Sequence, residues 1–201
     1  MKTLLLTGGS SGIGLHTVQL FAEKGWIVFE LSRSGKSTQD VTHIDCDVTD
    51  DESVKQAISE VMQRIDHLDV VINNAGFGIS GPIEYTSTTE AQKQFDVNFF
   101  GAFRLTKAVL PILRKQGGGR IIFTSSVAAD LSIPYQSFYS ASKSALNAMA
   151  LALANEVREF GIRVSVLMPG DVATGFTDAR EKNIHGVEVY KGVHTAVAAM
   201  E

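Results

Sequence analysis

Short apolar segments alternate with helix-periodic stretches along most of this chain. Six apolar segments have the length of buried strands, namely residues 4–6, 26–31, 42–44, 70–72, 120–123 and 163–167. Most are separated by stretches with apolar residues at helical spacing, but residues 32–41 leave little room for a full helix. This alternation predicts an α/β fold: a Rossmann-like, doubly wound parallel sheet of six strands in three layers.

Composition limits the class of protein further. The 201 residues fit one domain, spanning 1–201, and the 44% apolar and 20% charged residues are typical of a globular chain. A net charge of −4 makes nucleic acid an unlikely partner. Cys46 alone cannot form an internal disulfide or a cysteine metal cluster, and the five histidines lack metal-ligand spacing, so no metal is expected. No apolar run is long enough to cross a membrane, so we expect a cytoplasmic protein.

Helix boundaries are indicated by capping patterns. Thr49 with Glu52, and Ser87 with Glu90, have the spacing of capping boxes. The second pair precedes a helical stretch that runs to about Lys115. A further helix is expected over residues 138–160, where Gly161 ends it.

A glycine-rich turn follows the first predicted strand. It reads Thr7-Gly8-Gly9-Ser10-Ser11-Gly12-Ile13-Gly14 and leads into a helix. Glycines let backbone N–H groups approach a pyrophosphate at a helix N-terminus, and the hydroxyls of Thr7 and Ser10 add donors. The alternative is a turn that only connects strand and helix. We favour phosphate binding because the helix that follows is strongly patterned.

The end of the second strand bears on which dinucleotide would bind. NAD-binding folds place a carboxylate here to accept the ribose 2′-hydroxyl, but this chain has Ser32 and Arg33, with Lys36 nearby. Two cations suit a 2′-phosphate, which favours NADP(H) and leaves NAD(H) as the second choice. The alternative is that Arg33 and Lys36 are solvated loop charges.

Tyr139 and Lys143 stand four residues apart and therefore share one face of a helix. An ammonium beside a phenol, together with a helix N-terminus, is expected to lower the pKa of the phenol toward neutrality. An isolated Tyr-x-x-x-Lys is more often an ordinary helix surface, so the pair gains meaning only from its neighbours.

Those neighbours give a resemblance to the short-chain dehydrogenase/reductase family in its compact, non-extended form. The matching segments are Thr7–Gly14, Cys46-Asp47-Val48, Asn73-Asn74-Ala75-Gly76, Asn98, Ser125-Ser126, Tyr139-x3-Lys143 and Pro169-Gly170-x3-Thr174. The predicted strands agree with this resemblance, because the glycine turn, Asn73–Gly76, Ser126 and Pro169–Thr174 each follow one of them. Taken singly, Asn73–Gly76 could be a turn, Ser125-Ser126 a strand-end loop and Asn98 a bend.

The resemblance implies roles for these residues. The catalytic set would be Asn98, Ser126, Tyr139 and Lys143. Tyr139 would exchange a proton, Ser126 would bond the substrate oxygen, Lys143 would hold the nicotinamide ribose, and Asn98 would anchor a relay water. The cofactor would also contact Thr7, Gly8, Ser10, Ser11, Gly12, Ile13, Gly14, Ser32, Arg33, Asp47, Val48, Asn74, Ala75, Gly76, Pro169, Gly170, Val172 and Thr174.

The expected function is NADP(H)-dependent interconversion of a carbonyl and a secondary alcohol. Residues 77–83, residues 127–138 and the segment after Thr174 would form the substrate pocket. The first two stretches contain no Arg or Lys, which favours an apolar ketone. The pocket residues expected to be apolar are Phe77, Ile79, Ile133, Pro134, Tyr135, Phe138 and Phe176.

The chain also departs from the family pattern. Family members of this form usually continue to a seventh strand, which is absent here, and strand six is then expected at a sheet edge. Residues 175–195 are expected to be a mobile substrate lid, and Ala196–Met200 to begin a helix. A homodimer or homotetramer is expected through the helices of residues 95–113 and 138–160. Competing functions are a non-catalytic NAD(P)-binding redox sensor, an extended-type epimerase or dehydratase, and a scaffold. The intact Ser126, Tyr139 and Lys143 argue against the sensor, and the short chain and the three-residue spacing from Gly8 to Gly12 argue against the epimerase. A scaffold would not need a phosphate-binding turn.

Overall fold

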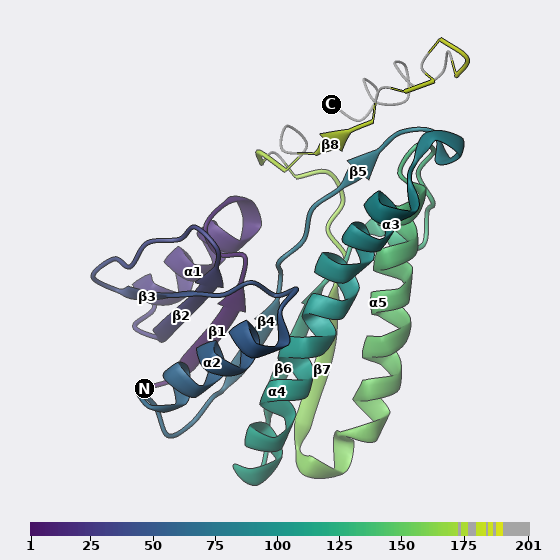
Figure 1. The fold of residues 1–201 in the computed structure, drawn as a ribbon. Coiled ribbons are helices and arrows are strands. Elements are labelled where there is room, and N and C mark those ends of the chain that lie inside the picture. Colours follow the sequence, from purple (N-terminus) through teal and green to yellow (C-terminus); the bar gives the residue numbers. More distant parts are fainter. Residues whose placement is uncertain (173, 177–179, 184, 187, 191–201) are drawn as a thin grey trace.

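The computed structural model describes residues 1–172, 174–176, 180–183, 185–186 and 188–190. Within them, six parallel strands form one sheet in the order β3-β2-β1-β4-β6-β7 (Figure 1). The strands are β1 (Thr3–Thr7), β2 (Ile27–Ser32), β3 (Val41–Asp45), β4 (Val70–Asn73), β6 (Gly119–Thr124) and β7 (Ile162–Leu167). Each coincides closely with a segment expected from the sequence.

Five α-helices are described between and beside these strands. They are α1 (Gly12–Glu23), α2 (Asp51–Met62), α3 (Thr88–Phe95), α4 (Ala102–Lys115) and α5 (Ser137–Glu156). A π-helical turn at Asp96–Gly101 joins α3 to α4, so the stretch expected up to Lys115 is helical throughout. After α5 a 3₁₀ turn at Arg158–Phe160 leads to Gly161, whose left-handed φ of 71° ends the helical stretch as expected.

The alternation of side chains along β1 shows how the layers form. Leu5 packs with α2, α4 and α5 on one face of the sheet, whereas Leu4 and Leu6 pack with Val18 of α1 on the other. All three leucines are at most 1% exposed, as expected for a central strand that is covered on both faces. The three-layered, doubly wound fold is thereby confirmed.

The two predicted capping boxes have different outcomes. Ser87 and Glu90 form the box that begins α3, with both reciprocal hydrogen bonds present. The box predicted for Thr49 and Glu52 is wrong. Asp50 caps α2 instead, accepting from the N–H groups of Glu52 and Ser53, because a carboxylate in the N-cap position satisfies those orphan donors and suits the helix dipole.

Connections and edges complete the arrangement. Residues 33–40 contain no helix, as the short connection between β2 and β3 predicted. Among the described residues β7 lies at a sheet edge. A small second sheet, formed by β5 (Ile79–Ser80) and β8 (Glu181–Lys182) in parallel, was not predicted. It lies beyond the end of the main sheet in Figure 1.

Strand order positions the site. The chain reverses its direction of sheet growth between β1 and β4, and in open α/β sheets ligands bind outside the carboxyl ends of the strands at such a switch point. No helix within the described ranges is long and apolar enough to span a bilayer. The helix predicted to begin at Ala196–Met200, and residues 177–179, 184, 187 and 191–195 of the predicted lid, lie outside the described residues.

Candidate active site

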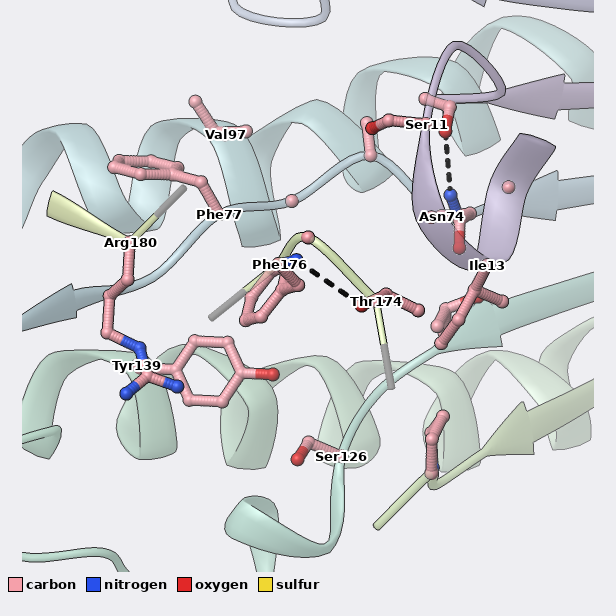
Figure 2. Close-up of a pocket in the computed structure, with 18 of the residues that line it drawn as sticks. Ser11, Ile13, Asn74, Phe77, Val97, Ser126, Tyr139, Thr174, Phe176 and Arg180 are labelled. Carbon is pink, nitrogen blue, oxygen red and sulfur yellow. Dashed lines mark hydrogen bonds between the residues drawn. The ribbon is translucent and has the colours of Figure 1, made fainter. Parts of the chain in front are cut away.

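A pocket of about 880 Å³ opens along the carboxyl ends of the central strands, and Figure 2 shows part of its lining. All the residues predicted for cofactor and catalysis line it except Thr7 and Asn98. The fold therefore brings together segments that are more than 160 residues apart, as the parallel topology predicts.

The glycine turn is tied to the turn after β4. The Thr7 hydroxyl accepts hydrogen bonds from the backbone N–H groups of Asn74 and Ala75, both at 3.1 Å. A Cβ on Gly8 would lie 2.9 Å from the Cα of Ala75, so the two turns touch backbone to backbone. Thr7 thus supports the pocket from beneath without lining it.

Glu30 holds the glycine turn from below, a role that the sequence analysis missed. Its carboxylate, in buried β2, accepts a hydrogen bond from Gly9 N–H at 2.9 Å and contacts His43 Nδ1 at 2.5 Å. Burial alone would lower the pKa of His43, but its contacts with Glu30 and Asp45 outweigh burial and raise it. The available signal was a glutamate within an otherwise apolar strand, a residue type that is rarely buried unless it is paired.

The far end of the pocket carries the groups expected to meet an adenine ribose. Ser32, Arg33 and Asp47 line it, whereas Lys36 is exposed and lies outside the lining. The Ser32 hydroxyl is buried with no hydrogen-bond partner. Burial alone would raise the pKa of Asp47. The hydrogen bonds from Thr49 outweigh burial, together with the positive charge of the nearby Arg33 guanidinium, and lower that pKa below its ordinary value. These groups fit a ribose that carries hydroxyl or phosphate acceptors.

Tyr139 and Lys143 come from the first two turns of α5, and both line the pocket near the carboxyl ends of the strands. Tyr139 is 9% exposed and Lys143 is 4% exposed. The Lys143 ammonium donates to the carbonyl of Thr124 at 2.8 Å and lies 5.8 Å from the centre of the Tyr139 ring. Ser126, just after β6, accepts from Ala128 N–H at 3.1 Å, and its side chain lies close enough to Tyr139 to influence the pKa of the phenol.

The pKa of Tyr139 differs from the sequence expectation. Burial raises it above its ordinary value, while the neighbouring Ser126 side chain and the Arg180 charge oppose that rise. Burial also lowers the pKa of Lys143 to about 8. The spacing of the two residues correctly predicted a shared helix face. It contained no information on how strongly burial at the carboxyl ends of the strands would desolvate both side chains.

Asn98 lies in the π-helical turn and does not line the pocket. Its side-chain amide accepts from Phe77 N–H and donates to the Phe77 carbonyl, both at 3.0 Å. It also donates to Ser142 Oγ at 3.2 Å. Asn98 therefore fixes the strand-end segment that carries Phe77, and any relay through water remains a prediction.

The substrate side of the pocket is smaller than expected. Phe77, Ile133 and Phe176 line it, whereas Ile79, Pro134, Tyr135 and Phe138 do not. The Phe176 ring packs against Tyr139 at 5.8 Å between centroids. Arg180, which lies within the lid expected over residues 175–195, also lines it and reaches toward Tyr139 (Figure 2).

The segment after β7 closes the pocket on one side. Val127 N–H donates to the carbonyl of Pro169 at 3.0 Å, which joins this segment to the turn after β6. A Cβ on Gly12, whose φ is +52°, would lie 3.6 Å from the Cβ of Thr174. The glycine turn and Thr174 thus face each other across a narrow cradle that a side chain at residue 12 would begin to fill. A dinucleotide's phosphates fit such a cradle.

A dinucleotide cradle at a switch point, with a buried tyrosine, a buried lysine and a half-buried serine beside it, defines an oxidoreductase site. The chain belongs to the short-chain dehydrogenase family, whose sequence profile, described as short chain dehydrogenase, matches residues 2–185. It is an oxidoreductase of carbonyl and CH–OH groups with an NAD(P)-binding Rossmann fold.

Individual proteins and solved structures are also similar to this chain. Over 180 residues the chain is 45% identical to the 3-ketodihydrosphingosine reductase of Bacteroides thetaiotaomicron, a match that covers 89% of this chain and 67% of that protein. It is 38% identical to human retinol dehydrogenase 8, covering 87% of this chain and 60% of that protein. The crystal structure of a short-chain dehydrogenase from Streptomyces avermitilis superposes with a TM-score of 0.86 at 32% identity, covering 99% of this chain and 82% of that one.

Proposed function

We propose that this protein is an NADP(H)-dependent oxidoreductase that interconverts a ketone and a secondary alcohol, with Tyr139 as the acid/base. One observation supports it most: the buried Tyr139 side chain lies near Ser126 and beside Lys143, in the same pocket as the glycine turn. A dinucleotide on that turn would extend along the pocket toward these three side chains.

The chemistry divides between cofactor and chain. When bound, the reduced dinucleotide supplies a hydride to the carbonyl carbon and is thereby oxidised. Ser126 donates a hydrogen bond to the carbonyl oxygen, where negative charge develops as the C=O π bond breaks. Tyr139 then gives its proton to that oxygen, which completes the alcohol, and solvent restores the proton to Tyr139.

The burial of Tyr139 keeps its hydroxyl in the proton-donor form. A raised pKa keeps the phenol protonated at neutral pH, which is the form that donates a proton. The Lys143 ammonium, fixed by the Thr124 carbonyl, lies near the ring and would stabilise the phenolate that remains. Asn98 acts indirectly, since its amide fixes the segment that contains Phe77.

Cofactor preference is testable at the end of β2. Arg33 lines the pocket beside the unpartnered Ser32 hydroxyl, and no carboxylate stands at the Ser32–Arg33 position to accept a ribose 2′-hydroxyl. We expect Arg33→Ala to weaken NADPH binding about tenfold or more while changing NADH binding little, because a charge-assisted hydrogen bond contributes roughly 1.5–3 kcal/mol. Titration of each variant with both cofactors measures this. Lys36→Ala, exposed and outside the pocket, is the matched control and should behave as wild type.

The function itself is tested by following nicotinamide absorbance with NADPH and NADH over a panel of ketones and aldehydes. We expect oxidation of NADPH that depends on a ketone. Cofactor binding without turnover on any substrate would contradict the proposal and favour the redox-sensor alternative.

We extend the proposal to the substrate cover and the assembly. Residues 175–195 would close over the ketone; their described part includes Phe176 and Arg180, which line the pocket, and β8. An apolar ketone is supported by Phe77, Ile133 and Phe176. A homodimer or homotetramer stays a prediction, in keeping with the exposed Phe103 and Leu151 on α4 and α5.

A further inference from the structure

Arg180 is a half-buried cation whose head is incompletely paired. Its Nε and Nη1 atoms are inaccessible and have no hydrogen-bond partner in the part of the chain that the structure describes. No salt bridge involving it occurs within the described ranges, and the nearest acidic neighbour in sequence, Glu181, is paired with Lys93 at 2.5 Å. A guanidinium held this way costs free energy unless a ligand completes its hydrogen bonds.

The position of Arg180 is fixed by the backbone on its C-terminal side. Glu181 N–H donates to the Gly78 carbonyl at 3.0 Å, and Asn183 N–H donates to the Ser80 carbonyl at 2.7 Å, so β8 is bound to β5. A Cβ on Gly78 would lie 3.5 Å from both Cγ and Nε of Arg180. The arginine stem therefore lies across the Gly78 backbone, and its head is directed to the pocket.

The pocket that Arg180 enters is the one that contains Tyr139. Both residues line it, and the positive charge of Arg180 opposes the rise of the Tyr139 pKa, which requires the two groups to be near each other. Figure 2 shows the guanidinium beside Tyr139, with Phe176 above. A substrate whose carbonyl meets Tyr139 would therefore have another part within reach of Arg180.

We propose that Arg180 recognises a carboxylate on the ketone substrate, so that the enzyme prefers oxo acids to neutral ketones. The planar guanidinium offers parallel N–H donors that match the two oxygens of a carboxylate. The apolar wall of Phe77, Ile133 and Phe176 would hold the rest of the substrate chain. This inference rests on the proposed function, and it adds a charged group to the apolar substrate expected from the sequence.

The test compares 2-, 3- and 4-oxodecanoate with their methyl esters, which have the same carbon skeleton up to the ester but no charge. For the wild type we expect kcat/KM with NADPH to be about tenfold to a hundredfold higher on at least one acid than on its ester. Arg180→Gln should abolish that preference by slowing the acid far more than the ester, and Arg180→Lys should restore part of it. Lys182→Gln removes the same charge two residues away, outside the pocket lining, and should keep the preference.

Each contrary result has a distinct meaning. Equal kcat/KM for acid and ester in the wild type, or faster turnover of the cationic ketone 3-ketodihydrosphingosine than of any oxo acid, would overturn the inference while leaving the ketone reductase in place. A loss of NADPH affinity in Arg180→Gln would also overturn it, since the arginine would then serve the cofactor. Turnover of neither acids nor esters would instead refute the proposed function. Melting temperatures of both variants check that the fold is retained.

Discussion

Replacing Tyr139 with phenylalanine should lower kcat for ketone reduction by about 100- to 10,000-fold, the range that a positioned general acid contributes. The change removes one oxygen from a side chain that is 9% exposed, and leaves the ring in contact with Phe176. Because the hydroxyl is the proposed proton donor next to Ser126, the developing alkoxide would lose the acid positioned to protonate it. Initial rates of NADPH oxidation measure the loss.

The same variant should bind NADPH nearly as well as wild type, because the glycine turn and Thr174 remain in place. Tyr135→Phe is the matched control: it removes the same atom from a nearby tyrosine that does not line the pocket, and it should retain wild-type turnover. If Tyr139→Phe kept more than about a tenth of the wild-type kcat, a loss below the range expected for a general acid, proton transfer would have to be assigned to another group. If it lost NADPH affinity in parallel with kcat, the hydroxyl would belong to cofactor binding.

The raised pKa of Tyr139 shows where sequence reasoning fails. Spacing of four residues on a helix predicts that Lys143 shares a face with Tyr139, and it does. The direction of the pKa shift depends on desolvation by surrounding residues, including the sheet end and Phe176, which no local spacing encodes. Lys143 itself is directed to the Thr124 carbonyl, a contact between residues 19 positions apart.

Elements that follow local rules were predictable from the sequence. The strand β1 is a run of leucines, and the Ser87–Glu90 pair begins α3, since in each case the deciding interactions lie within a few residues. The turns at the carboxyl ends of β1, β4, β6 and β7 meet because parallel strands place those ends together. That single topological fact brought most of the cofactor set to one pocket.

What was missed depends on long-range pairing of short segments. β5 and β8 have two residues each, so no periodicity identifies them, and their pairing places Arg180 in the pocket. Glu30 was missed for a related reason, because its partners are a backbone N–H in the glycine turn and a histidine on the neighbouring strand. The roles of Arg180 and Glu30 are both decided by the residues that lie opposite these side chains in the fold.

Replacing Gly14 with alanine should damage the dinucleotide cradle, although helix propensity predicts the opposite. Gly14 lies inside α1, where alanine is normally favoured over glycine by about 1 kcal/mol. Here a Cβ would lie 2.1 Å from the Gly8 carbonyl oxygen and 2.7 Å from Asn74 Nδ2. Backbone cannot yield as a flexible side chain does, so either the glycine turn or the start of α1 must move.

We therefore expect Gly14→Ala to reduce the free energy of unfolding by about 1–3 kcal/mol, the usual cost of overpacking. NADPH affinity should fall about tenfold or more, because the Gly8 carbonyl also accepts from Asn74, which joins the two turns that line the pocket. Urea titration and NADPH binding measure the two effects. Gln19→Ala, on the exposed side of the same helix, gains propensity without crowding and should be as stable as wild type or more so. A Gly14→Ala variant that matched it in both measurements would show that the turn yields freely, and the close backbone contact would then play no part in binding the dinucleotide.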